Sequence, residues 1–228
     1  FFFGATNNNA DTIKQLDRHT VPGIKLFMGA STGNMLVDRR EALEMTFLTA
    51  AELNLPVMTH CEDSGIINEN MKVAKEQFGD DPDITHHWEI RSAEACWASS
   101  LLAVELARKY KTQLHIAHIS TAKELSLANL PEDEGRITLE AVIAHIAFSN
   151  EDYLTKKALI KCNPSVKTIE MLFVRHSRMD ALQSLVLIML LTYGHRSKVA
   201  ALRLHQECQW FNSHSSLCLS WLTKVFLQ

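Results

Sequence analysis

The feature that most constrains the fold of this chain is a repeated alternation of short apolar segments and longer helical ones across residues 1–169. Five short runs of β-branched or apolar residues have the composition of buried strands: Phe1–Gly4, Gly23–Met28, Pro56–Cys61, Gln113–Ile119 and Ala158–Asn163. Strands and helices that alternate predict a parallel α/β sheet. No Gly-x-Gly-x-x-Gly follows any predicted strand, which favours a (β/α)8 barrel over a doubly wound open sheet.

Start signals for helices lie between the predicted strands. Ser92 is predicted to cap the helix that follows it. Asp38-x-x-Glu41 and Thr121-x-x-Glu124 have the spacing of capping boxes. These signals place helices after the strands and support the repeated strand–helix unit.

Charge and composition exclude several classes of protein. A net charge of −3 over 228 residues is not basic enough to indicate a nucleic-acid partner. The longest apolar run, Leu185–Thr192, is too short to span a bilayer, so no membrane partner is expected. The 5 Cys are an odd number and form no Cys-x-x-Cys pair, which indicates reduced thiols in a cytoplasmic protein.

Three polar residues on successive predicted strands form a candidate site. His60 and His118 lie near the C-terminal ends of their strands, and Lys25 lies inside an apolar strand. The strand ends converge in a barrel, which favours a metal site. For each residue taken alone, a structural role is the alternative. For Lys25 this would be a stem packed inside the barrel, with the ammonium reaching water at the barrel rim. His115 alternates with His118, so only one of these two is expected to face inward.

Asn163 is a further candidate. Pro164 forces the residue before it into an extended conformation, which suits an amide presented to a ligand. Asn-Pro is equally typical of an ordinary turn at the end of a strand, so both interpretations of Asn163 remain open.

Six segments resemble, in order and spacing, the dihydroorotase branch of the amidohydrolase superfamily. They are Gly4–Asn9, Gly23–Ala30, Val57–Asp63, Ile90–Cys96, Leu114–Thr121 and Lys161–Pro164. Each segment is modest alone, but six in order are specific. The resemblance implies that residues 1–169 are the central part of an amidohydrolase barrel, so that the chain forms a partial (β/α)8 TIM-type barrel.

The resemblance also implies a role for each candidate residue. Lys25, converted to a carbamate, would bridge two zinc ions, and His60 and His118 would bind the second zinc. Asn163 would hydrogen-bond the pyrimidine ring. Metal-activated water would hydrolyse the ring amide of dihydroorotate, and the reverse reaction would close N-carbamoyl-L-aspartate in pyrimidine biosynthesis. The implied partner is a small molecule, and a homo-oligomer is compatible with this family.

Two family segments are not found in the chain. One is the His-x-His strand that binds the first zinc, and the other is Thr-Asp-His-Ala-Pro-His, whose Asp is the general acid/base. Because this Asp is missing, no catalytic residue is assigned. If the codons for 186–194 are read out of frame by one base, they permit the missing segment Thr-Asp-His-Ala-Pro-His. The same shift from Leu202 permits a second segment that resembles the family. We therefore interpret residues 170–228 as an out-of-frame tail, and expect the chain to be an N-terminally truncated and inactive copy.

Two other functions follow from the same residues. Hydantoinases and allantoinases share the Lys and His ligands, but Gly4–Asn9 and Lys161–Pro164 look more like dihydroorotase. A non-catalytic protein that keeps the barrel surface to bind a partner is favoured if residues 170–228 are genuine.

Overall fold

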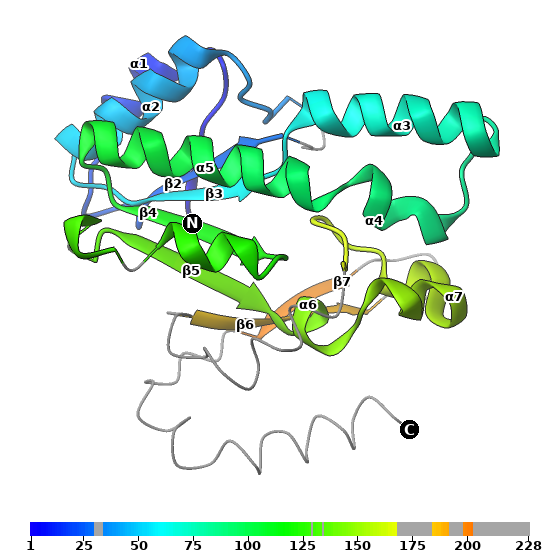
Figure 1. The fold of residues 1–228 in the computed structure, drawn as a ribbon. Coiled ribbons are helices and arrows are strands. Elements are labelled where there is room, and N and C mark those ends of the chain that lie inside the picture. Colours follow the sequence, from blue (N-terminus) through cyan, green and yellow to red (C-terminus); the bar gives the residue numbers. More distant parts are fainter. Residues whose placement is uncertain (30–33, 129, 134, 168–183, 192–197, 203–228) are drawn as a thin grey trace, which may run out of the picture.

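A computed structural model describes residues 1–29, 34–128, 130–133, 135–167, 184–191 and 198–202 of the chain (Figure 1). For the last two ranges it describes the backbone as strands. The predicted tail at 170–228 therefore lies mostly outside the described residues, and its interpretation as an out-of-frame segment stays a prediction.

The described strands form one sheet in which each strand lies beside the next one along the chain. The strands are β1 (Phe3–Gly4), β2 (Ile24–Met28), β3 (Val57–Cys61), β4 (Leu114–Ile119), β5 (Ile137–Val142), β6 (Ser184–Leu191) and β7 (Lys198–Leu202). Strands β1 to β6 are parallel, and β7 is antiparallel to β6. A doubly wound sheet reverses its strand order, whereas this sequential order is that of a (β/α) barrel. The predicted fold class is confirmed, and the described residues form part of such a barrel.

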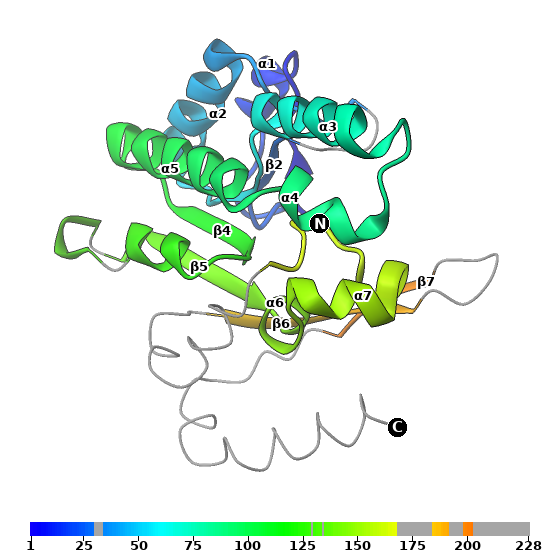
Figure 2. The same cartoon turned by 45° about the vertical axis from the view of Figure 1, so that its right-hand side comes forward.

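Helices join the parallel strands. The α-helices are α1 (Ala10–Ile13), α2 (Arg40–Glu52), α3 (Ser64–Phe78), α4 (His87–Ile90), α5 (Ala93–Tyr110), α6 (Ile143–Ala147) and α7 (Tyr153–Lys156). Short 3₁₀ helices are η1 (Ile84–His86), η2 (Lys123–Leu127), η3 (Pro131–Asp133), η4 (Asn150–Asp152) and η5 (Lys157–Ile160). Figures 1 and 2 show α1, α2 and α5 together on one face of the sheet, and α6 and α7 beyond the tip of β5. No helix among the described residues is long and apolar enough to cross a membrane.

The two faces of the sheet differ in polarity. One row across β2 to β5 runs from Leu26 through Thr59 and Ile116 to Leu139, and all four residues are fully buried. This row faces the core shared with α2 and α5, where Phe47 is also fully buried. The neighbouring row joins Lys25, Met58, His115 and Thr138 on the opposite face. Alternation along each strand therefore separates an apolar face under the helices from a face with polar residues.

The predicted strand Ala158–Asn163 is wrong. Residues 157–160 form η5, and 161–167 have no regular structure. Lys157, which ends α7, has a φ of 48°, so the chain turns back instead of extending. Ile160 and Val166 then pack on the buried ring of Tyr153, and the Val166 N–H donates to its hydroxyl at 3.2 Å. The apolar residues of this segment are used for packing on α7.

Strand β5 (Ile137–Val142) was not predicted from the sequence. Its apolar run is interrupted by Glu140, which is buried. An isolated acidic residue in such a run obscures the strand pattern, and only pairing with β4 and β6 makes this segment a strand.

The capping predictions had different outcomes. Ser92 caps α5 by accepting from the Ala95 N–H, as predicted. Thr121 and Glu124 form the predicted reciprocal hydrogen bonds, although the element they start is the 3₁₀ helix η2. The box at Asp38 is wrong, because α2 begins at Arg40 and the Asp38 carboxylate accepts from Asn7 Nδ2 at 2.8 Å.

The thiols in the described residues are free. Cys61 and Cys96 are buried, and Cys162 is partly buried. Burial raises the pKa of Cys61 to about 11 and that of Cys96 to about 12, so both are protonated near neutral pH. The other two, Cys208 and Cys218, lie outside the described residues.

Replacing Phe47 by Ala is expected to destabilise the fold strongly. Phe47 is fully buried between α2 and the sheet, and truncation of a buried Phe costs about 3–5 kcal/mol of unfolding free energy. Urea unfolding followed by circular dichroism measures the loss. Phe78→Ala is the control, because Phe78 is 50% exposed and its loss should cost no more than about 1 kcal/mol. Equal losses would contradict the core described here.

Candidate metal site at the strand ends

The structure brings His60 and His118 into contact. His60 is the fourth residue of β3 and His118 the fifth residue of β4. Their rings are edge to face, with centroids 4.9 Å apart, and His60 Nδ1 lies 3.2 Å from His118 Nε2. Two imidazole nitrogens bound to one tetrahedral zinc at the usual bond length stand about 3.3 Å apart. The spacing of these two atoms therefore fits two ligands of a single zinc ion.

A β-bulge in β4 turns the His118 side chain toward His60. The register with β5 shifts between Ile116 and Ile119, and His118 has a φ of 43°. Two residues of β4 thus oppose one residue of β5, which is how a bulge redirects a side chain. The prediction that His115 and His118 cannot share a face is wrong for this reason.

Glu140 on β5 bridges His115 and the backbone of His118. Its Oε2 lies 3.4 Å from His115 Nε2, while its Oε1 accepts from the backbone N–H of His118 at 3.2 Å. His115 Nδ1 also lies 2.9 Å from the Thr138 hydroxyl. Glu140 therefore fixes the bulge from the neighbouring strand and connects His115 to the backbone of His118.

A buried carboxylate stands behind His60. Glu62 is fully buried, and its Oε2 lies 2.8 Å from His60 Nε2. Arg91 binds both carboxylate oxygens, with Nε donating to Oε1 at 2.9 Å and Nη2 contacting Oε2. Burial alone would raise the pKa of Glu62, but the contacts with His60 and Arg91 and the charge of Arg91 lower it to about 2. Glu62 is thus an anion beside the ring nitrogen that faces away from His118.

His118 is held neutral at physiological pH. Burial lowers its pKa well below the usual value, and the charges of His60, Lys25 and His145 lower it further. Its Nδ1 is buried and has no hydrogen-bond partner in the part of the chain that the structure describes. Only a neutral imidazole has the lone pair that a metal needs, so this environment suits a ligand.

Lys25 lies on the same sheet face, one strand away from His60. Its Nζ is 5.0 Å from the centroid of the Phe27 ring, and that ring is 5.8 Å from the ring of His60. Burial lowers the pKa of Lys25, while the charges of Cys61 and Glu140 oppose this effect. Lys25 therefore lies near the two histidines, with the Phe27 ring between it and His60.

Asn163 is not at the end of a strand. It is exposed, in the irregular segment after η5. The residues on either side of it are anchored: the carbonyl oxygen of Cys162 lies 3.0 Å from His87 Nε2, and that of Pro164 lies 2.8 Å from His145 Nε2. The structure thus fixes the backbone around Asn163 and leaves its side chain facing solvent.

Three contributors to the site were missed in the sequence analysis. Glu62, Arg91 and Glu140 were given no role, although the first two lie inside the segments that resemble the family. The available signal for Glu62 was an acidic residue directly after a strand that ends in His60-Cys61. Among the described residues, no three His, Cys, Asp or Glu side chains are grouped so that they could hold a metal, so the site consists of a His pair with Lys25 nearby.

No protein-family model matches the chain. Known proteins with similar sequences include a dihydroorotase of Methanosphaera stadtmanae, which is 32% identical over 63% of this chain and 32% of its own length. An allantoinase of Escherichia coli (strain K12) is 25% identical over 73% of this chain and 38% of its own length. The chain thus spans about a third of the length of these relatives.

Solved structures give the same answer for the fold. The L-hydantoinase (dihydropyrimidinase) from Arthrobacter aurescens superimposes with a TM-score of 0.72 and 19% identity over 80% of this chain and 41% of that one. A dihydroorotase from Campylobacter jejuni superimposes with a TM-score of 0.51 and 18% identity over 80% of this chain and 47% of that one. In sequence the chain is thus similar to a dihydroorotase and an allantoinase, and in fold it is similar to a hydantoinase and a dihydroorotase.

Proposed function

We propose that this chain is the central part of a metal-dependent hydrolase that interconverts dihydroorotate and N-carbamoyl-L-aspartate. The observation that supports it most is the pair of facing nitrogens, His60 Nδ1 and His118 Nε2, 3.2 Å apart on neighbouring strands. Active sites of β/α barrels lie at the C-terminal ends of their strands, and both histidines are there. The dihydroorotase of M. stadtmanae, at 32% identity, favours this substrate.

His60 and His118 would hold zinc, and Lys25, as a carbamate, would supply a further oxygen ligand. Bound zinc lowers the pKa of water and polarises a carbonyl oxygen. Formation of a carbamate needs a neutral amine. Burial lowers the pKa of Lys25 and so increases the fraction of its amine that is neutral. The fit of the residues to the metal rests on the spacing of the His nitrogens and on the unpartnered Nδ1 of His118.

The other residues of the site would orient these ligands. Glu62, held by Arg91, lies against Nε2 of His60 and leaves Nδ1 as the atom for the metal. Carboxylates behind metal-binding histidines commonly set the ring orientation in this way. Glu140 would do the same for the backbone of His118. Asn163 would contact the ring of the substrate, which requires the exposed amide to turn toward the site.

Zinc binding tests the ligands directly. The chain is expected to bind zinc, and His60→Ala or His118→Ala should weaken binding by at least about tenfold, the loss seen even for residues that only orient ligands. Competition with a chromophoric chelator measures the affinity, and the absorption of Co²⁺ in place of zinc reports tetrahedral nitrogen coordination. His19→Ala is the matched control, because His19 is exposed. Unchanged affinity in both site variants would refute the assignment.

Catalysis is expected only from a more complete protein. The described residues provide two His and one Lys near one another, whereas a two-zinc site needs more ligands. Loss of residues that act as a unit removes nearly all activity, so the 228-residue chain should not measurably hydrolyse dihydroorotate. A full-length version with the intact reading frame should do so when zinc and bicarbonate are supplied.

A substrate panel with that full-length version separates the candidate substrates. Faster hydrolysis of allantoin than of dihydroorotate would favour the allantoinase alternative, which the similarity to the E. coli protein keeps open. Comparable rates for the 228-residue chain and the full-length version would show that the chain already contains a complete site.

A further inference from the structure

A buried carboxylate binds the chain segment that follows His118. Glu124, in η2, is 2% exposed. Its Oε1 accepts from the Ser100 hydroxyl at 2.7 Å, and its Oε2 accepts from the backbone N–H groups of Ser120 at 3.2 Å and Thr121 at 3.1 Å. The Thr121 hydroxyl also donates to Oε2, at 2.9 Å. These four donors are neutral groups, and a buried carboxylate is costly unless such hydrogen bonds are made.

The contacts of Glu124 tie the end of β4 to helix α5. Ser100 lies in α5, which packs on the sheet. Ser120 and Thr121 directly follow Ile119, the last residue of β4. His118 is only two positions before Ser120, so a movement of this segment would also move the backbone of His118.

The backbone of His118 needs support from its surroundings. Its φ of 43° lies in the left-handed region, which a residue with a side chain occupies stably only where neighbouring groups hold it there. Glu140 accepts from the N–H of His118 at 3.2 Å, which holds the residue against β5. Glu124 holds the chain two residues later. The bulged conformation is therefore fixed both at His118 and just after it.

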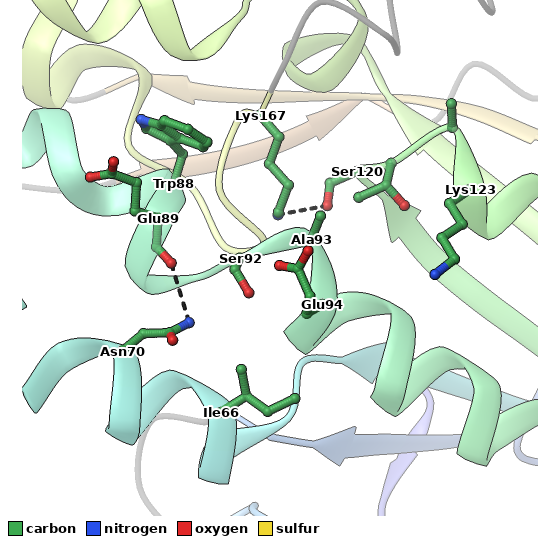
Figure 3. A pocket seen from close by; sticks show the side chains of 12 residues that line it. Ile66, Asn70, Trp88, Glu89, Ser92, Ala93, Glu94, Ser120, Lys123 and Lys167 are labelled. Atoms are coloured by element: carbon green, nitrogen blue, oxygen red, sulfur yellow. Dashed lines mark hydrogen bonds between the residues drawn. The ribbon is translucent and has the colours of Figure 1, made fainter. Parts of the chain in front are cut away.

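Lys167 contacts the same segment in a different way. This lysine is buried, and its Nζ donates to the hydroxyl of Ser120 at 2.9 Å (Figure 3). The contact joins the ends of two side chains, which can rotate while the backbone moves. Glu124 instead binds backbone N–H groups, so its contacts constrain the course of the chain after His118 more directly than that of Lys167.

We propose that Glu124 is a positioning residue of the metal site, which keeps His118 Nε2 facing His60 Nδ1 by holding the backbone after β4. The proposal rests on the function proposed above, in which these two nitrogens bind one zinc ion. They are 3.2 Å apart, and a rotation of the His118 backbone would separate them. Glu124 acts only through His118 and takes no part in the chemical step.

Replacing Glu124 by Met or by Gln tests the hydrogen bonds at nearly constant side-chain length. Met has no oxygen to accept them, whereas the Gln carbonyl can accept from both backbone N–H groups and the Gln amide can donate to the Ser100 hydroxyl. In the 228-residue chain, Glu124→Met should weaken zinc binding by at least about tenfold, as loss of a residue that orients ligands does, and should change the Co²⁺ absorption spectrum. Glu124→Gln should retain most of the affinity and the parent spectrum.

Thr112→Val is the matched control. Thr112 is fully buried just before β4, and its hydroxyl donates to the Phe47 carbonyl oxygen at 2.9 Å. The replacement removes a buried hydrogen bond at the other end of the same strand. It should lower the melting temperature and leave zinc affinity and the Co²⁺ spectrum unchanged. An equal loss of affinity in Thr112→Val and Glu124→Met would show that lost stability alone explains the effect, and would overturn the proposal.

A measurement without metal separates this proposal from the proposed function. A nuclear Overhauser effect between the ring protons of His60 and His118 should be present in the parent chain and in Glu124→Gln, and weakened in folded Glu124→Met. If these ring contacts respond as expected but the parent chain binds neither zinc nor Co²⁺, the proposed function is refuted and the positioning of His118 by Glu124 stands.

Thermal melts show which variants fold, and only folded variants are compared. Unchanged ring contacts or unchanged zinc affinity in folded Glu124→Met would overturn the proposal, and so would the absence of the ring contacts from the parent chain. If Glu124→Met does not fold, Ser100→Ala decides, because it removes only the hydrogen bond that ties Glu124 to α5. It should weaken the ring contacts relative to Thr112→Val, and no difference between these two variants would overturn the proposal.

Discussion

The alternation of side chains along a strand is the constraint on which the rest of this structure depends. Helices α2 and α5 cover one face of the parallel sheet, and the residues under them, such as Leu26 and Ile116, are fully buried and apolar. The residues that alternate with these along each strand must then lie on the other face. Lys25 and His60 both lie there because of their positions in β2 and β3, and the bulge in β4 adds His118. The polar site and the apolar core are two consequences of one pattern.

Buried carboxylates join the strand ends of this site to the segments that pack beside them. A carboxylate inside a protein is tolerated only when charged or hydrogen-bonding groups surround it. Glu62 joins the end of β3 to the start of α5 through Arg91. Glu124 accepts from the backbone N–H groups of Ser120 and Thr121 and so fixes the segment after His118. The interactions that satisfy these charges therefore also hold the segment after β4, where Ser120 accepts a hydrogen bond from Lys167 Nζ.

Much of the sheet was predictable because local patterns encode which face a residue takes. β2, β3 and β4 lie where short apolar runs predicted them, and the Ser92 cap is confirmed. The strand at Ala158–Asn163 was wrong, because an apolar run also suits packing on a neighbouring helix, here against Tyr153. β5 was missed because buried Glu140 resembles a surface residue until its partners on β4 are known.

The sequence by itself determined a parallel β/α fold and the strand positions of Lys25, His60 and His118, since periodicity and turn chemistry are local properties. Only the tertiary structure decided that His60 Nδ1 faces His118 Nε2 and that Glu62, held by Arg91, stands behind His60. A bulge exists only relative to the strand it pairs with, and a buried charge is recognisable only from the groups that surround it. Both depend on contacts between segments that are distant along the chain, which no local pattern contains.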